Sequence, residues 1–431
     1  MTQIRIGALV IFLACGAAFG WAASHYVRAG ATGSANGSDW TNAWTDLPST
    51  FVRGDTYYLA AGTYGAHVFN TADTGVFIYV KMATGADHGT ATGWAAGYAS
   101  GQAVFQTTTG ILWNITTGHW DFDGVVGSGP GGQGIKLYDT SMNEQEPIVY
   151  VINGYSASYL NFRHVEFQGP GAGNSDPTRM FFVNATNTNN LTFQYDYFHE
   201  TGKTWMTLNQ NNANVLIERC YFRNCGSGDA TMHSDGMSIY ATTNINMIIR
   251  YNVFENMLGT ANTTYIEPQG SGGSGIYVYG NVFMATSASE FTSQGIFSYT
   301  SSDYGSLVRI FNNTIYGLHS YNPGVSGTTG CTDIQVTNNV WQACSTAPSF
   351  PNVTAASNTL NTGVASFVNA LIGDFHLTID TAAGTTLASP YNADPDGTVR
   401  GSSGVWSIWA YQFAGLAITP PAIPTGFHKN P

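Results

Sequence analysis

The sequence contains little charge of either sign. Only 9% of its 431 residues are charged, the formal net charge is −12, and lysine occurs four times. A surface that binds nucleic acid needs a basic stripe to neutralise phosphates, so nucleic acid is excluded as the expected partner. A polyanionic ligand would need a local basic cluster or a bridging cation to overcome the acidic field.

The sequence also lacks an apolar run long enough to span a bilayer. The longest run, residues 6–19, falls short of the ~20 residues that a transmembrane helix needs. Arg5 precedes this run and small residues follow it, so residues 1–23 are predicted to form a secretory signal peptide. We expect a secreted or cell-surface protein without membrane association after signal removal. Lipidation at Cys15 is a lesser alternative.

Cysteine is scarce, and four cysteines remain after the signal is removed. An even number in an exported chain permits two disulfides. The short separations favour Cys220 with Cys225 and Cys331 with Cys344, although three connectivities are allowed. Zinc is disfavoured because no paired CxxC spacing is present.

An eleven-residue phrase returns seven times along the chain. Examples are "NVLIERCYFRN" (214–224) and "NMIIRYNVFEN" (246–256). Its ninth residue serves as an anchor, and successive anchors are separated by 31, 24, 32, 29, 32 and 26 residues. The anchors are Phe167, Phe198, Phe222, Phe254, Phe283, Ile315 and Trp341. Repeats of this period indicate a solenoid.

The phrase itself predicts two strands joined by a bend. Its second and fourth positions are apolar, as expected of a strand with one buried face, and the next inward position is the ninth. A bend is therefore expected near position seven, where we expect Asn in the left-handed conformation, bonded to the copies above and below. A β-sandwich is disfavoured because hairpin signals are scarce. The last four copies have Asn252, Asn281, Asn313 and Asn339 at this position.

Both ends of the chain carry a family resemblance. The segments "HYVRAGATGSANGSDWTNAW", "RGDTYYLAAGTY" and "LASPYNADPDGTVRGSSGVWSIWAYQF" resemble those of secreted bacterial proteins in the pectate-lyase-like superfamily. The resemblance implies an all-β fold, a single-stranded right-handed parallel β-helix (solenoid) with an N-terminal cap. We expect a cap and first coils over 24–110, central coils over 111–345, C-terminal coils and a closing segment over 346–415, and a Pro-rich tail over 416–431.

Candidate catalytic residues lie upstream of the phrases. Arg179, Lys203 and Asp235 each precede their anchors by 19 residues, so they are expected in one column of stacked strands. Beside Arg179, the pKa of Lys203 would fall, making it a base, while Arg179 would neutralise a substrate carboxylate. β-Elimination of a uronic acid needs such a pair, and lyases of the superfamily use Lys or Arg bases. The column is alternatively a structural salt ladder.

The motif "MHSDGMSI" adds His233 beside Asp235, and Glu267 lies one coil further on. Asp235 and Glu267 would serve a glycoside hydrolase if ~5.5 Å apart for retention or ~6.5–9.5 Å for inversion. Asp229, Asp235 and Glu267 could instead hold Ca²⁺, which takes oxygen ligands. The Asp-Gly dipeptide is alternatively ordinary turn chemistry.

Aromatic residues on the central coils are expected to stack on sugar rings. Trp205, Tyr240 and Tyr265 are the candidates for substrate binding, together with Glu267. The sequence thus predicts a secreted polysaccharide lyase that acts on a uronic-acid-containing polysaccharide in a groove on the central coils. The alternatives are a non-catalytic glycan-binding, adhesin or self-assembling surface or matrix protein, and a glycoside hydrolase.

Overall fold

The computed structural model describes 13 segments of the chain. They are 22–139, 146–152, 157–172, 179–186, 188–209, 211–226, 233–259, 263–269, 271–290, 294–299, 304–361, 367–370 and 373–413. Most of the predicted signal, Cys15, Asp229 and the Pro-rich tail lie outside them. No helix within these segments is long and apolar enough to cross a membrane.

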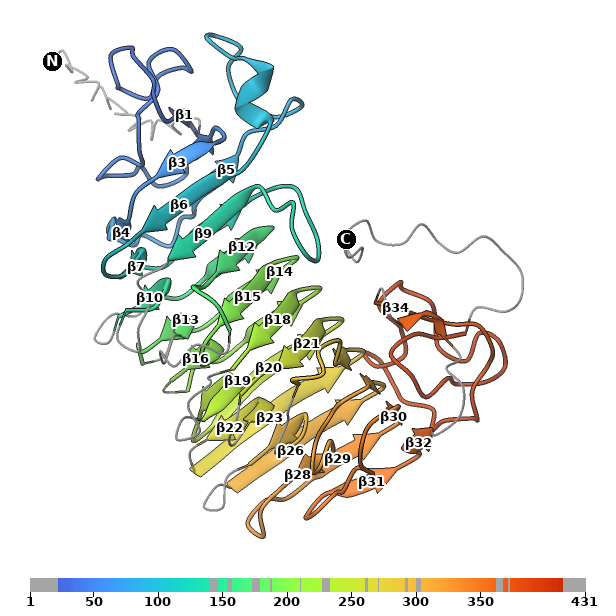
Figure 1. Cartoon of the computed structure of the whole chain (residues 1–431). Coiled ribbons are helices and arrows are strands. Elements are labelled where there is room, and N and C mark those ends of the chain that lie inside the picture. The colour runs from blue at the N-terminus through green and yellow to red at the C-terminus, as the bar shows by residue number, and fades with distance from the viewer. Residues whose placement is uncertain are drawn as a thin grey trace, which may run out of the picture.

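Three long sheets run side by side along the molecule, and all strand pairings within them are parallel (Figure 1). We call these sheets A, B and C and give their strands below. Successive strands of the chain lie in sheet C, sheet A and sheet B in turn, so one coil contributes one strand to each sheet. The predicted right-handed parallel β-helix is confirmed. A β-sandwich is excluded for these sheets, because its neighbouring strands would be antiparallel.

The bounds of the strands follow the stacking order. Sheet A contains β1 (Ser24–Val27), β2 (Thr56–Leu59), β5 (Ile78–Met82), β8 (Trp120–Asp123), β11 (Leu160–Arg163), β14 (Leu191–Gln194), β17 (Val215–Glu218), β20 (Asn244–Arg250), β23 (Ser271–Tyr279), β26 (Tyr304–Phe311), β29 (Ile334–Thr337) and β31 (Thr354–Ala356). Sheet B contains β3 (Gly62–Tyr64), β6 (Ala103–Thr107), β9 (Ile135–Asp139), β12 (Val165–Gln168), β15 (Tyr197–Thr201), β18 (Tyr221–Cys225), β21 (Val253–Met257), β24 (Val282–Met284), β27 (Thr314–Tyr316), β30 (Val340–Gln342) and β32 (Thr359–Asn361).

Sheet C is shorter and carries the candidate residues. It contains β4 (His67–Phe69), β7 (Trp113–Ile115), β10 (Val149–Val151), β13 (Arg179–Val183), β16 (Thr204–Leu208), β19 (Ser234–Tyr240), β22 (Thr263–Gln269), β25 (Phe297–Ser298) and β28 (Val325–Ser326). An antiparallel pair, β33 (Phe367–Asn369) and β34 (Asp374–Leu377), follows the coils, and a 3₁₀ helix, η1, covers Ala96–Ala99.

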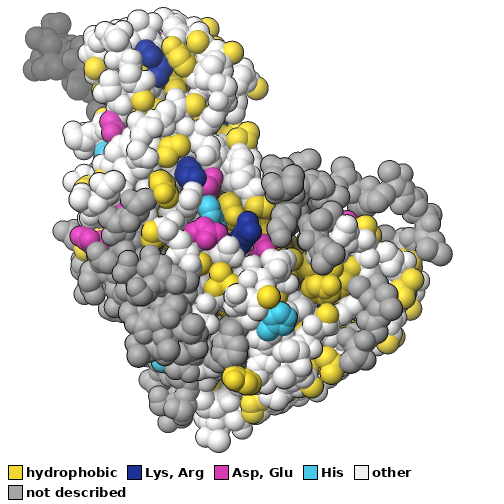
Figure 2. Space-filling view, viewed as in Figure 1, with side chains coloured by type: hydrophobic (Ala, Val, Ile, Leu, Met, Phe, Trp, Pro, Cys, Tyr) yellow, Lys and Arg dark blue, Asp and Glu magenta, His cyan; other side chains and the backbone are white. Residues whose placement is uncertain are grey.

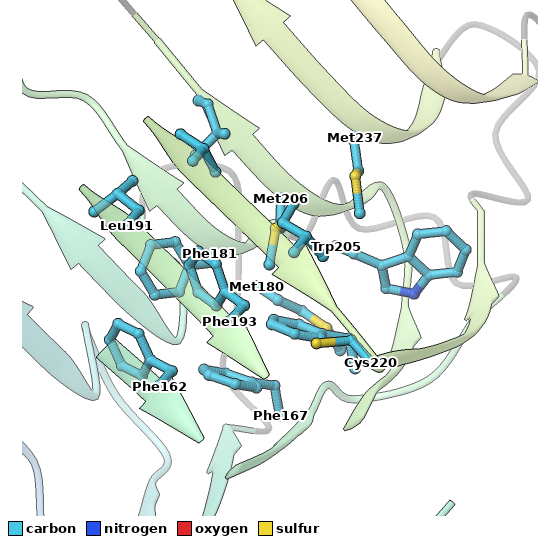
Figure 3. Packing of buried hydrophobic residues seen from close by; sticks show 14 of the residues in the cluster. Phe162, Phe167, Met180, Phe181, Leu191, Phe193, Trp205, Met206, Cys220 and Met237 are labelled. Atoms are coloured by element: carbon cyan, nitrogen blue, oxygen red, sulfur yellow. The ribbon is translucent and has the colours of Figure 1, made fainter. Parts of the chain in front are cut away.

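The anchors of the repeated phrase stack directly on one another in sheet B. Each of the seven anchors pairs in register with the next. Their rings stack with centroids 4.2 Å apart for Phe167 and Phe198 and 4.8 Å apart for Phe254 and Phe283. Further rings, among them Phe162, Phe181 and Phe193, fill the interior of the coils (Figure 3). The stacking predicted from the period is confirmed.

The corner between sheets A and B corrects one detail of the prediction. The left-handed residue is position six of the phrase, for example Tyr251 with φ 60° and Asn312 with φ 53°, and not the Asn at position seven. The Asn residues are buried and form the predicted ladder. Asn252 Nδ2 donates to Asn281 Oδ1 at 3.0 Å, and Asn281 Nδ2 donates to Asn313 Oδ1 at 3.0 Å.

The first strand of sheet A does not present a free edge. Residues 37–44 run along β1, where Tyr26 N donates to Gly37 O at 3.1 Å and Trp44 N donates to Tyr26 O at 3.0 Å. Tyr26 also packs in a second small core with Trp40 and Tyr58. Pairing of an edge strand removes a template for aggregation, which is the role expected of a cap.

The end of the described chain folds back onto the outer face of sheet B (Figure 1). Phe367 and Phe375 pack there against Tyr316 of β27, and Trp409 packs against Phe367. Arg219 Nη2 donates to Pro395 O at 2.7 Å, which joins this segment to the A–B corner. Sheet C receives no such cover from the residues of this cluster.

The predicted disulfides are wrong, because all four cysteines are free. Cys220 immediately precedes β18 and Cys225 ends it, and an extended chain of this length separates the two residues by ~16 Å. A disulfide needs Cα atoms within ~7 Å. Cys331 and Cys344 lie on opposite sides of the pair β29 and β30, so they are also on different corners of a coil.

Candidate functional site

Sheet C has an irregularity that gathers polar side chains on its outer face. Trp205 and Met206 are consecutive in β16, yet both belong to the core, as do Tyr265 and Ile266 in β22. Strict alternation is therefore broken, and residues three apart can point to the same side. Ser238 Oγ accordingly donates to Asp235 Oδ2 at 3.3 Å within β19.

Gly236 is required at this irregularity. A β-carbon at Gly236 would lie 2.6 Å from Trp205 Cζ3 and 2.6 Å from Tyr265 O. Real β-carbons do not approach other atoms so closely, so only glycine fits between these two neighbours. Asp235 and Gly236 lie inside strand β19. The interpretation of this dipeptide as a turn is therefore wrong.

Asp235 and Glu267 form a buried carboxyl pair on neighbouring coils. Asp235 is 3% exposed and Glu267 is 1% exposed. Burial raises the pKa of Asp235 well above its usual range, and the hydrogen bond and charge of Glu267 raise it further. No donor among the described residues contacts Asp235 Oδ1 or Glu267 Oε1. The pair therefore needs a shared proton or a bound cation to be stable in the protein interior.

His233 completes a group of three possible metal ligands. One ring nitrogen of His233 and one oxygen each of Asp235 and Glu267 lie within 4.8 Å of one another. Calcium prefers oxygen ligands, whereas an imidazole nitrogen suits zinc or iron. The donor set of this group thus departs from the calcium site expected from the sequence, whose third residue, Asp229, lies outside the described residues.

The predicted column of charged residues needs a shift of one residue. Arg179 pairs with Thr204, not with Lys203, and the register of Met206 with Met237 places Thr204 beside Asp235. Arg179 and Asp235 therefore share a column, as predicted, with Thr204 between them. Lys203 immediately precedes β16, and its positive charge acts on Asp235, lowering the pKa of that carboxyl against the larger effect of burial.

Tyr240 lies near the same group and is 38% exposed. Burial raises the pKa of Tyr240, the charges of Asp235 and Glu267 raise it further, and Arg179 opposes them. Its neighbour Gln269 donates from Nε2 to Glu267 Oε2 at 2.6 Å. Gln269 carried no signal in the sequence, because its contact with Glu267 depends on the register of the coils.

Two predicted substrate-binding residues are in the wrong place for that role. Trp205 and Tyr265 are both 0% exposed and belong to the core. Figure 3 shows Trp205 among the buried residues, with Met206 and Met237 nearby. The sequence pattern placed them outward because it assumed unbroken alternation in β16 and β22.

A second charged row, on the outer face of sheet B, was not predicted as a unit. Lys, Arg, Asp, Glu and His side chains gather over these strands in the middle of the face shown in Figure 2. Lys136 Nζ lies 2.8 Å from Glu166 Oε1, and His199 Nε2 lies 3.1 Å from the same oxygen. Glu255 likewise contacts Tyr221 and Arg223.

The carboxylates of this sheet-B row are fully paired, which distinguishes them from Asp235 and Glu267. Burial opposes ionisation of Glu166, but hydrogen bonds from His199, Lys136 and Gln102 outweigh it and lower the pKa of Glu166 to about 2. A carboxylate satisfied in this way is a structural ion pair. The unsatisfied pair on sheet C is the better candidate for chemistry.

Comparison with known proteins found a similar structure but no matching family model or curated sequence. No family model matches the sequence, and no curated protein matches it. Among solved structures, the chain is similar to pectate lyase Pel9A, with 13% identity and a TM-score of 0.49 over 91% of this chain and 97% of that chain. The parallel β-helix of the present chain is established by its own sheet topology.

Proposed function

We propose that the protein is a secreted polysaccharide lyase that cleaves a uronic-acid-containing polysaccharide on the outer face of sheet C. The observation that carries the proposal is the buried carboxyl of Asp235, which shares a column with Arg179 and is close enough to Lys203 for that side chain to act on its pKa. With Lys203 as the neutral amine that a base requires, Arg179 balances the carboxylate of Glu267, and a protonated Asp235 adds no charge. A site without excess negative charge admits an anionic substrate despite the net −12 of the chain.

Each residue has a distinct role in the proposed elimination. Lys203 withdraws the proton on the carbon next to the substrate carboxylate, and Arg179 balances the negative charge that develops on that carboxylate. Asp235, kept neutral by the proton that it shares with Glu267, places no second negative charge beside the substrate carboxylate. The bond to the leaving sugar oxygen breaks as the carbon–carbon double bond forms, and Tyr240 supplies the proton that this oxygen takes.

The hydrolase alternative is less well supported. Asp235 and Glu267 are on neighbouring coils as that hypothesis requires, but their carboxyl groups are hydrogen-bonded to each other. Retaining glycosidases hold the two groups ~5–5.5 Å apart, with the sugar between them. A direct contact leaves no such space in this arrangement.

The test is incubation of the mature chain with a panel of polyuronates, followed by the absorbance of the unsaturated product. Lys203→Ala is expected to lower kcat at least 100-fold, because general bases contribute about 10²–10⁴-fold. Lys203→Arg keeps the positive charge but is a poor base, so KM should change little while kcat falls. Arg309→Ala removes a cation from sheet A, where Arg309 pairs with Asp333, and should leave kcat unchanged.

Three outcomes would contradict the proposal. Full activity in Lys203→Ala would remove the assigned base. Release of reducing ends from neutral glycans without unsaturated product would favour the hydrolase. The absence of product in both assays would favour a non-catalytic, glycan-binding surface protein.

The calcium hypothesis is tested in the same assay. No step of the proposed elimination uses a metal ion, so chelation followed by dialysis should leave activity unchanged. Loss of activity that added Ca²⁺ restores would instead assign a cation to the group of His233, Asp235 and Glu267.

A further inference from the structure

A cavity of about 310 Å³, lined by both polar and apolar surface, lies on the outer face of sheet A, in the first coils. Its walls come from β2, β5, β8 and β11, far along the chain from the strands that carry Asp235 and Glu267. It is lined by Thr56, Tyr58, Tyr79, Lys81, Asp121, Asp123 and Arg163. The proposed lyase site is on sheet C, so the cavity is separate from it.

Planar hydrogen-bonding groups form the floor of the cavity. Asp121 is 5% exposed, and it accepts hydrogen bonds from Arg163 Nη2 at 2.6 Å and Asn161 Nδ2 at 3.0 Å. Arg163 Nη2 also lies 3.4 Å from Asp123 Oδ2. The guanidinium has five N–H donors and uses one terminal nitrogen in these contacts, and its side chain is 34% exposed. Donors and acceptors in fixed positions therefore face the cavity.

Asp87 forms hydrogen bonds to two side chains at the rim of the cavity. Tyr58 Oη donates to Asp87 Oδ1 at 2.7 Å, and Lys81 Nζ bonds the other carboxylate oxygen. These hydrogen bonds, from Lys81 first and Tyr58 second, lower the pKa of Asp87. These hydrogen bonds hold a charged wall in place beside the floor, and such preorganisation lowers the entropy cost of binding.

Tyr79 supplies an aromatic surface next to these polar groups. It is 40% exposed and pairs in register with Asp121 on the next coil. Neighbouring strands are ~4.8 Å apart, so the edge of a sugar ring stacked on Tyr79 would be within reach of the row that Asp121, Asn161 and Arg163 form. An aromatic face beside planar donors and acceptors matches a sugar, whose C–H face stacks while its hydroxyls bond.

The charge of the cavity selects among sugars. Among the lining residues, Lys81 and Arg163 balance Asp121 and Asp123, and Asp87, bonded to Lys81 behind the rim, adds a further negative charge. The excess negative charge disfavours a uronate and is neutral toward hydroxyl groups. We propose that this cavity is a second carbohydrate-binding site, which takes a neutral polysaccharide and is independent of the chemistry on sheet C.

The experiment is electrophoresis of the full mature chain through gels that contain a soluble β-glucan, a galactomannan, a xylan or a polygalacturonate. The chain should be retarded by at least one neutral polysaccharide. Tyr79→Ala should weaken the dissociation constant at least tenfold, because aromatic stacking supplies the apolar part of sugar binding. Tyr321→Ala removes a tyrosine that is 79% exposed outside the cavity and should have no effect.

Folding is checked by comparing the thermal unfolding of both variants with that of the parent chain. Three results would overturn the proposal: no retardation by any neutral polysaccharide, equal retardation in Tyr79→Ala and the parent, or retardation by polygalacturonate alone. Lys203→Ala should bind the neutral polysaccharide normally. Loss of lyase activity in this variant therefore does not change the binding result, so either proposal can be contradicted without the other.

Discussion

Asp235 and Glu267 hydrogen-bond each other across two neighbouring coils, whereas the buried carboxylates Glu166 and Glu255 of sheet B pair with a cation and a hydroxyl. Two buried carboxylates side by side repel each other strongly, so burial and the neighbouring Glu267 raise the pKa of Asp235 and favour one proton between them. Among the described residues, one oxygen of each carboxyl lacks a further donor, and this buried pair is the most direct indication that sheet C carries a reaction.

The shared proton predicts different effects for two substitutions of the same residue. Asp235→Asn keeps an N–H donor toward Glu267 and should change the free energy of unfolding by less than about 1 kcal/mol. Asp235→Ala leaves the Glu267 carboxylate buried without that donor and should cost roughly 2–3 kcal/mol. Urea unfolding of both variants checks this. An equal loss in the two would mean that the pair does not share a proton.

Gly236 predicts a steric effect in the same strand. Gly236→Ala places a β-carbon 2.6 Å from the Trp205 ring, and overpacking of a core costs about 1–3 kcal/mol. Gly85→Ala is the matched control, because a β-carbon there meets no atom within 4 Å. Thermal unfolding should separate the variants, and a wild-type melting temperature for Gly236→Ala would contradict the close contact.

The Asn ladder predicts that a single buried amide is important to stability. Asn281 donates to Ile249 O at 2.9 Å and to Asn313 Oδ1, and it accepts from Asn252. Asn281→Ala leaves partners on both neighbouring coils unsatisfied, so we expect a loss of roughly 2–4 kcal/mol in urea unfolding. Asn244→Ala, at an exposed position on the same type of coil, should cost less than about 0.5 kcal/mol. Similar losses for the two would argue against the ladder.

Glu166 predicts how stability depends on acid. Its pKa is about 2 in the folded chain and about 4.5 when unfolded, so the unfolded state binds the proton more readily as the pH falls. The stabilisation is complete above about pH 4.5 and disappears as the pH falls towards 2, and it amounts to about 3 kcal/mol. Glu166→Gln should therefore flatten the acid limb of a stability–pH curve. An unchanged acid limb would show that Lys136 and His199 do not hold this carboxylate ionised.

The architecture followed from the sequence because a stacked solenoid repeats its constraints. Every coil must place an apolar residue at the same point, so the period of the anchors, Phe167 and its successors, was visible without coordinates. The buried Asn ladder was likewise visible, although the left-handed residue was one position away. The disulfides were not predictable from spacing, because a short separation along an extended strand is a long distance in space.

The sequence by itself determined the parallel β-helix, the shared column of Arg179 and Asp235, and the small number of Lys and Arg residues. Only the tertiary structure decided which of the candidate site residues meet. A break in the alternation of inward and outward side chains turned Trp205 and Tyr265 inward and brought Asp235 against Glu267. A shift of one residue in the strand register moved Lys203 out of the column that contains Arg179. Counting along a chain assumes regular strands, whereas local packing around Gly236 sets where each side chain points.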